Sequence, residues 1–163
     1  MQAVLLAGGL GTRLRAVVAD RPKVMAEVAG RPFLEHLLQR LAAQGVRRVV
    51  LAVGYLHEHI VGHFGDAWGG LSIAYSVEHD PLGTGGAVRQ ALSLAAAGPC
   101  FVLNADTWLE FDMQAMLAAH LEAAARLTMA VRPLDDVGRF GALEISAGRI
   151  VGFQEKGRSG PGA

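Results

Sequence analysis

Near its start the chain reads Ala3-Val4-Leu5-Leu6-Ala7-Gly8-Gly9-Leu10-Gly11-Thr12-Arg13-Leu14. The apolar first half predicts a strand that is buried on both faces, because no polar residue alternates with the aliphatic ones. The glycines that follow end the strand, let the backbone pass close to a ligand and turn its N–H groups toward an anion. Arg13 adds a fork of donors that matches phosphate oxygens. This stretch therefore predicts a buried strand that leads into a phosphate-binding loop.

Two familiar phosphate loops do not fit this stretch. A Walker loop requires a Gly-Lys-Ser/Thr sequence, which is absent. A dinucleotide-binding loop requires a third glycine, but Leu14 occupies that place. The next expected strand ends in Val53-Gly54-Tyr55, without the acidic residue that would hold a ribose. An ordinary glycine turn stays open as the alternative for the loop taken alone.

Strand-like and helix-like stretches alternate along the rest of the chain. Strands are expected at residues 3–7, 46–53, 71–77, 99–103 and 127–131, and helices at 32–44, 57–64, 85–97 and 113–125. A hairpin is expected from residues 140–145 and 149–154. This order predicts an α/β fold with a mainly parallel sheet covered on both faces. Ligands bind such folds at the carboxyl ends of the strands, where residues 8–15, 78–86 and 104–107 are expected.

Composition limits the classes of protein to which the chain can belong. Its 163 residues suit one domain, residues 1–163, and 52% apolar against 18% charged residues predict a packed core. The net charge of zero argues against a nucleic acid or an anionic membrane as partner, so a local site must hold any phosphate. Cys100 is the single cysteine, which fits a reducing compartment and a cytoplasmic location. Neither a signal peptide nor a membrane span is expected.

Two further segments carry candidate chemistry. The loop from Glu78 to Ala87 joins a strand to a helix, whose exposed amides suit an anion or a base edge. Asp106 follows a buried strand, and a carboxylate there can hold Mg²⁺ against a triphosphate. His57, His59 and His63 invite a metal interpretation, but a solvated helix face is favoured. Trp68 and Trp108 are interpreted as packing residues.

These motifs together resemble the sugar-1-phosphate nucleotidyltransferase family, over essentially all 163 residues. The resemblance rests on the Gly-Gly-x-Gly-Thr-Arg-Leu run, on Pro22-Lys23, on the helix opened by Pro32, on Pro-Leu-Gly-Thr-Gly-Gly-Ala at 81–87, on Asn-Ala-Asp-Thr at 104–107, on Arg-Phe-Gly at 139–141 and on Glu155-Lys156. Ala105 stands where the family usually has glycine. The pattern is most similar to the heptose-1-phosphate guanylyltransferase branch.

The resemblance implies a Rossmann-like three-layer α/β/α sandwich with a mainly parallel mixed sheet, the nucleotide-diphospho-sugar transferase fold. It implies transfer of a nucleotidyl group from a nucleoside triphosphate to a sugar 1-phosphate with Mg²⁺, releasing pyrophosphate. GTP and D-glycero-D-manno-heptose 1-phosphate are the favoured substrates. Mannose-1-phosphate guanylyltransferase and N-acetylmuramate-1-phosphate uridylyltransferase activities are the alternatives. A homo-oligomer stays open.

The resemblance also implies roles for particular residues. The catalytic residues would be Arg13, Lys23 and Asp106, with Asp106 as the metal ligand. Those that bind the nucleotide would be Leu6, Ala7, Gly8, Gly9, Gly11, Thr12, Glu78, Gly83 and Thr84. Those that bind the sugar phosphate would be Gly141, Glu155 and Lys156.

Two rival functional classes stay open for the chain. Family members continue past the point where this chain ends, through a second metal-binding aspartate, so a truncated chain is expected. A catalytically impaired nucleotide-binding homologue is therefore one rival. A nicotinamide-dependent oxidoreductase is the other, and it is disfavoured by Leu14 and by the missing acidic residue.

Overall fold

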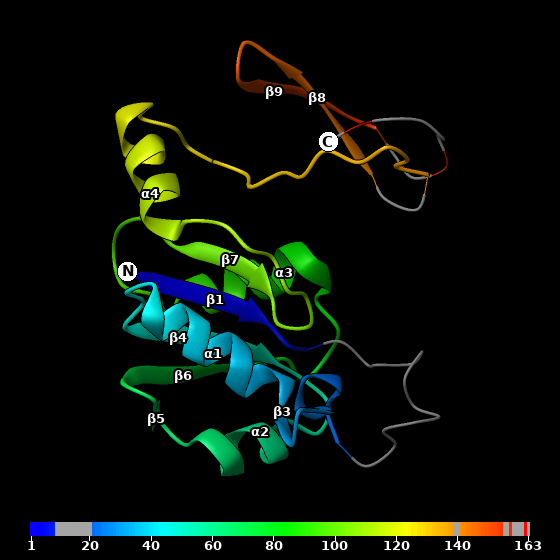
Figure 1. The fold of residues 1–163 in the computed structure, drawn as a ribbon. Helices are drawn as coiled ribbons and strands as arrows, with labels where there is room; N and C mark the ends of the chain where they lie inside the picture. The colour runs from blue at the N-terminus through cyan, green and yellow to red at the C-terminus, as the bar shows by residue number, and fades with distance from the viewer. Residues whose placement is uncertain (9–20, 139–140, 155–156, 158–161, 163) are drawn as a thin grey trace. The chain divides into compact units, whose positions relative to one another are not determined.

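The structure is a computed structural model that describes residues 1–8, 21–138, 141–154, 157 and 162. The expected residues Gly9, Gly11, Thr12 and Arg13 thus lie outside the described part. The chain divides into two compact units, Met1–Gln114 and Ala115–Ala163 (Figure 1). Each unit is described by itself.

A five-stranded sheet forms the centre of the first unit. Its strands are β1 (Gln2–Leu6), β4 (Arg48–Val53), β5 (Ala67–Trp68), β6 (Leu71–Val77) and β7 (Phe101–Asn104). They lie in the order β5-β6-β4-β1-β7, and all neighbours are parallel except β5 and β6. The chain moves from β1 outward to β4 and β6, then returns to place β7 on the other side of β1. The strand order therefore reverses at β1, the kind of position where α/β sheets bind ligands.

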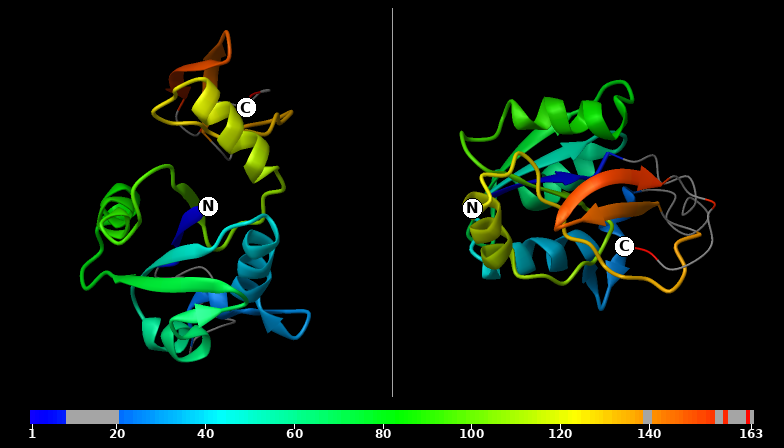
Figure 2. Two further views of the ribbon diagram at one scale, coloured as in Figure 1. Left: turned by 90° about the vertical axis from the view of Figure 1, so that its left-hand side faces the viewer. Right: turned by 90° about the horizontal axis from the view of Figure 1, so that it is seen from above.

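Helices cover both faces of this sheet, as the alternating side chains of β1 show. Ala3 and Leu5 belong to one buried cluster, together with residues of α1 (Phe33–Ala43) and α2 (His57–Phe64). Val4 belongs to a second cluster on the opposite face, with Ala87 and Ala91 of α3 (Gly83–Leu92). Figure 2 shows α1 on one side of the sheet and α3 on the other. The expected three-layer sandwich with a mainly parallel mixed sheet is confirmed for this unit.

Helix α1 illustrates how the sequence sets an element. Four leucines at helical spacing, Leu34, Leu37, Leu38 and Leu41, are its buried residues. Its end is a Schellman motif, in which the Val46 N–H bonds the Leu41 carbonyl at 3.0 Å and the Gly45 N–H bonds the Ala42 carbonyl at 3.0 Å. Gly45 has φ +91°, a conformation that glycine adopts without steric cost. The expected boundaries of this helix are therefore confirmed to within one residue.

The second unit holds most of α4 (Met113–Glu122) and a separate hairpin of β8 (Ala142–Ser146) and β9 (Arg149–Gln154). The hairpin was expected, and its turn residues Ala147 and Gly148 both have positive φ, 47° and 73°, as a type I′ turn requires.

Among the described residues, no helix is long and apolar enough to cross a bilayer.

The expected strand at residues 127–131 is wrong. Its apolar side chains are largely exposed, Leu127 at 72%, and the segment pairs with no described strand. A β-branched or apolar run forms a strand only when a neighbour completes its hydrogen-bond ladder. Conversely, the sequence did not reveal the 3₁₀ helix η1 (Lys23–Met25) or the short strands β2 (Glu27–Val28), β3 (Arg31–Pro32) and β5. Elements of two or three residues are too short to show a period.

A buried hydroxyl on β6 gives a test of the core. Ser76 is 2% exposed, and its Oγ has no hydrogen-bond partner in the part of the chain that the structure describes. Because an unsatisfied buried hydroxyl costs free energy, we expect Ser76→Ala to raise the free energy of unfolding by about 1 kcal/mol in urea denaturation. Ser72→Ala, on an exposed position of the same strand, is the control and should change it by less than about 0.5 kcal/mol. Destabilisation by Ser76→Ala would contradict the prediction.

Candidate active site

Four neighbouring parallel strands end at one edge of the sheet (Figure 1). Leu6, the last residue of β1, pairs in register with Ala52 of β4 and with Asn104 of β7. Val53, at the end of β4, pairs with Val77 of β6. The segments that follow these strands therefore lie along one edge, which is where three of the expected site segments begin.

The backbone just after β1 lies very close to its neighbours. The Ala7 N–H bonds the Ala52 carbonyl at 2.8 Å and carries the ladder one residue beyond the strand. A Cβ on Gly54 would lie 3.1 Å from the Gly8 carbonyl oxygen, and a Cβ on Gly8 would lie 2.8 Å from Glu78 Oε1. Neither glycine has a positive φ. Lack of space beside the Gly8 backbone favours glycine at position 54, whereas a side chain at position 8 would require the Glu78 carboxylate to move. The Glu78 carboxylate thus sits directly against the start of the glycine-rich loop.

Glu78 is fixed at this edge by its own loop. Its N–H bonds the Val53 carbonyl at 2.8 Å, and its Oε2 accepts a hydrogen bond from the Leu82 N–H at 3.2 Å. Helix α3 begins directly afterwards at Gly83, whose φ of +68° favours glycine. No side chain caps this helix start. The first amides of α3, including that of Thr84, are therefore available to an anion or a base edge beside the Glu78 carboxylate.

Lys23 and Asp106 form an ion pair of 2.7 Å between Nζ and Oδ2. Lys23 is carried by η1, which Val24 and Met25 anchor in the core. Thr107 Oγ1 donates to the other carboxylate oxygen at 3.2 Å. The hydrogen bond from Lys23 lowers the pKa of the Asp106 carboxyl below its usual value, against the opposing effect of partial burial. The carboxylate is therefore ionised, held on both oxygens, and still 39% exposed.

Ala105 accommodates the departure from the family pattern without strain. Its N–H bonds the Leu6 carbonyl at 3.0 Å and extends the ladder between β1 and β7. Its side chain is fully buried, and it is not among the described residues that have positive φ. The methyl group is therefore part of the core.

The structure describes only part of the expected site. Leu6, Gly8, Glu78, Lys23 and Asp106 follow or flank the strand ends of the first unit, as set out above. Gly9, Gly11, Thr12, Arg13, Glu155 and Lys156 lie outside the described residues. Gly141 belongs to the second unit, where a Cβ on it would lie 3.1 Å from the Gln154 carbonyl oxygen.

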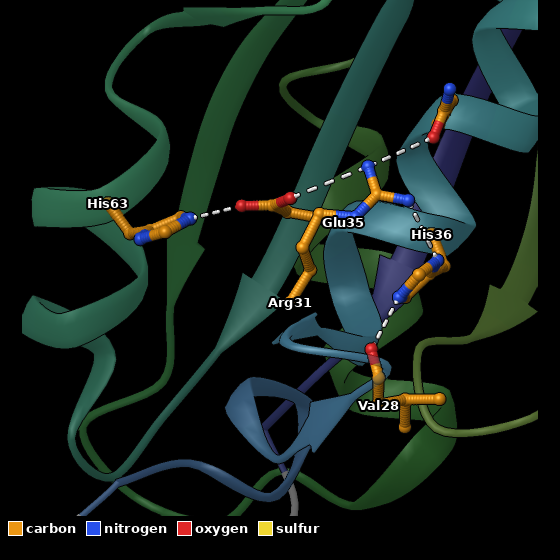
Figure 3. A network of polar contacts seen from close by, with 6 residues as sticks. Val28, Arg31, Glu35, His36 and His63 are labelled. Atoms are coloured by element: carbon orange, nitrogen blue, oxygen red, sulfur yellow. Dashed lines mark hydrogen bonds and ion pairs between the residues drawn. The ribbon is translucent and has the colours of Figure 1, made fainter.

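The histidines of α2 do not gather into a metal centre. His63 Nε2 lies 2.7 Å from Glu35 Oε1, and Glu35 also pairs with Arg31 at 4.0 Å (Figure 3). His57 Nδ1 lies 3.1 Å from the Gly54 carbonyl oxygen. Within the described ranges, no group of three His, Cys, Asp or Glu side chains could hold a metal ion. His63 is therefore a partly exposed link between α2 and α1.

Sequence reasoning overlooked Gly54 as a part of this site. Gly54 was expected to end a strand, and its run from Val53 to His57 contributed to the resemblance, but no role in the site was predicted for it. A glycine directly after a strand that neighbours the glycine-rich loop is the signal that could have revealed it, because two backbones that approach this closely exclude a Cβ. The resemblance placed Lys23 and Asp106 in one catalytic site, but their direct contact was not predicted, since residues 83 positions apart show no local pattern.

Comparison with known proteins shows the family of the chain. The model of the nucleotidyl transferase family matches residues 2–161. A D-glycero-alpha-D-manno-heptose 1-phosphate guanylyltransferase of Aneurinibacillus thermoaerophilus is 40% identical over 96% of this chain and 68% of its own length. A mannose-1-phosphate guanylyltransferase of Mycobacterium tuberculosis is 36% identical over 99% of this chain but only 45% of its own length.

A solved structure gives the same result for the fold. The crystal structure of HddC from Yersinia pseudotuberculosis complexed with GMP-PN superposes with a TM-score of 0.83 and 37% identity, covering 99% of this chain and 72% of that one. The chain belongs to the nucleotidyl transferase family, and its resemblance to sugar-1-phosphate nucleotidyltransferases is confirmed.

Proposed function

We propose that the protein transfers a guanylyl group from GTP to D-glycero-D-manno-heptose 1-phosphate, forming a GDP-heptose and pyrophosphate. The observation that carries this proposal is the Lys23–Asp106 pair, which places a cation and an ionised carboxylate 2.7 Å apart beside the end of β1. The guanylyltransferase relatives support the choice of substrates.

The reaction is an in-line displacement at the α-phosphorus. An oxygen of the sugar phosphate forms the new bond, the bond to the β-phosphate oxygen breaks, and pyrophosphate leaves with that electron pair. No general base is needed, because a phosphate monoester is already ionised at neutral pH. Two polyanions must approach each other, so neutralising and aligning charge are the main tasks of the protein.

We assign Lys23 to the α-phosphate, Arg13 to the β- and γ-phosphates, and Lys156 to the sugar phosphate. Before substrate binds, the ion pair lowers the pKa of the Asp106 carboxyl further below its usual value and holds its orientation. The amides of Gly8, Gly9, Gly11 and Thr12 would line the phosphate loop, with Leu6 and Ala7 at its base. Glu155 and Gly141 would meet the sugar hydroxyls.

Asp106 fits one of the one or two carboxylates that Mg²⁺ takes from a nucleotide-binding protein, the other ligands being phosphate oxygens and water. Its oxygens are partly exposed and already attract one cation, the Lys23 ammonium. When bound there, Mg²⁺ would neutralise charge on the triphosphate.

The base preference follows from the chemistry of Glu78. An ionised carboxylate only accepts hydrogen bonds, and guanine presents two neighbouring donors, N1–H and the N2 amino group. The Glu78 carboxylate is held in one place, because one oxygen lies against Gly8 and the other accepts a hydrogen bond from the Leu82 N–H. We assign Gly83 and Thr84, at the start of α3, to the remaining edge of the base.

Both units are proposed to belong to one nucleotidyltransferase domain, residues 1–163, because the family match crosses their boundary. The expected C-terminal completion of that domain stays a prediction. A cytoplasmic location also stays a prediction, supported by the single cysteine.

Pyrophosphate release tests the function directly. The protein is mixed with Mg²⁺, each of four nucleoside triphosphates, and heptose, mannose or N-acetylated sugar 1-phosphates. We expect the highest kcat/KM with GTP and heptose 1-phosphate. The mannose and N-acetylmuramate combinations are the alternatives. Triphosphate binding without any release would instead identify a catalytically impaired homologue.

Removing the charge of Lys23 tests the proposed phosphate contact. Lys23→Met should lower kcat by about 100- to 1,000-fold, by analogy with the loss of one preorganised donor to the transition state. Arg89→Met, which removes one positive charge from the last turn of α3, should leave kcat within about threefold. Near-normal turnover of Lys23→Met would rule out the role.

Glu78→Gln tests the base contact. The amide places a donor where the carboxylate offers only acceptors, so the preference for GTP over the other triphosphates should fall by about 10- to 100-fold in kcat/KM. Asp80→Asn makes the same change of charge in the same exposed loop and should keep the preference. An unchanged preference in Glu78→Gln would show that the base is recognised elsewhere.

A further inference from the structure

Trp108 lies two residues beyond Asp106, and it packs against two side chains of α1 although it is partly exposed. It is 46% exposed, but its ring meets the ring of Phe33 edge-on, with centroids 6.4 Å apart and an interplanar angle of 70°. The Arg40 guanidinium lies over the same ring, 5.2 Å from its centroid. Phe33 and Arg40 are seven residues, about two turns, apart on α1. Trp108 thus lies along one face of that helix.

Polar contacts connect the edge of the Trp108 ring to the same arginine. Trp108 Nε1–H donates to Glu110 Oε1 at 3.2 Å. The same carboxylate oxygen lies 3.8 Å from Arg40 Nη1. Trp108, Glu110 and Arg40 therefore form a closed set of contacts that fixes the ring in two directions.

The start of α1 is also the place to which Lys23 is attached. The Phe33 N–H bonds the Ala26 carbonyl at 2.9 Å, and the Ala26 N–H bonds the Lys23 carbonyl at 3.0 Å. Phe33 thus contacts the segment of Lys23 through its backbone and the segment of Asp106 through its ring and Trp108. The segments that carry Lys23 and Asp106 are therefore both connected to the first turn of α1.

The far side of the Asp106 loop has a separate anchor. The Ala105 N–H bonds the Leu6 carbonyl at 3.0 Å, and the Ala105 side chain is fully buried. Asp106 and Thr107 therefore span the short distance between a fixed point on β1 and a fixed point on α1. Without the second point, the segment after Asp106 would next be anchored only at Phe111 and Met113, which pack in the core.

We propose that Trp108 is a positioning residue, which packs on the first turns of α1 and thereby sets the place of Asp106 relative to Lys23. The proposal rests on the function given above, in which Asp106 and Lys23 act together on the phosphates. Trp108 contacts no reacting group in this scheme and acts through the loop.

The test compares Trp108→Ala with Trp108→Phe and with a matched control. Trp68→Ala removes the other tryptophan of the chain, whose ring packs 5.6 Å from that of Phe64. Amide hydrogen exchange of residues 104–110 is measured without ligand, and kcat and KM are measured with GTP and the sugar phosphate. The exchange measurement needs no substrate, so it tests the packing apart from the proposed function.

We expect Trp108→Ala to raise exchange of residues 104–110 about tenfold, with β4 unchanged. Its kcat should fall about 10- to 100-fold with a smaller change in KM, because a catalytic group displaced by an ångström costs rate. Trp108→Phe keeps a ring against Phe33 and should restore most of both properties. Trp68→Ala should lower the unfolding temperature but leave exchange of residues 104–110 and kcat near the parent values.

Several results would overturn the inference. One is a folded Trp108→Ala protein with parental exchange at residues 104–110 and parental kcat. Another is Trp68→Ala matching Trp108→Ala in both measurements, which indicates a merely structural role. Should Trp108→Ala fail to fold, Arg40→Met, which removes the cation over the ring, replaces it, and parental exchange and kcat in that variant would count against the proposal. A parent without turnover on any substrate would refute the proposed function, and exchange alone would then decide the role of Trp108.

Discussion

The parallel ladder that holds β1 between β4 and β7 is the constraint on which the rest of the first unit depends. It places Leu6, Ala52 and Asn104 in register, so the chain leaves three strands at one edge. Beyond that register, Gly8 lies close to Gly54 and to the Glu78 carboxylate, and a Cβ on Gly54 would crowd the Gly8 backbone. A shift of β1 by one residue would exchange its two faces and separate these groups.

The contacts at these strand ends hold side chains of the candidate site in place and contribute little to the free energy of folding. The Lys23–Asp106 pair is about 40% exposed on both sides, and such pairs contribute only about 0.2–1 kcal/mol to folding. Its value lies in keeping an ionised carboxylate in a fixed place. The same is true of Trp108, which leaves nearly half of its surface in solvent while it contacts two turns of α1.

Local patterns anticipated the elements that a clear short-range signal marks, either a helical hydrophobic period or a turn between two strand-like runs. Helix α1, with its four leucines and the glycine at its end, and the hairpin of β8 and β9 were both expected from sequence. The pattern failed at residues 127–131, where an apolar run has no partner strand. It also gave no sign of η1, although that single turn carries Lys23. In both cases contacts from distant parts of the chain decide the outcome.

The sequence by itself determined the fold class, the family and which residue types stand after each strand. These follow from short-range features, namely hydrophobic period, glycine placement and motif spacing, and each can be judged within a few residues. Only the tertiary structure decided that Lys23 meets Asp106, that Glu78 rests on Gly8, and that Trp108 joins the segment of Asp106 to α1. The physical reason is that these contacts join residues far apart in the chain, and their distances are set by the packing of a whole sheet and its helices.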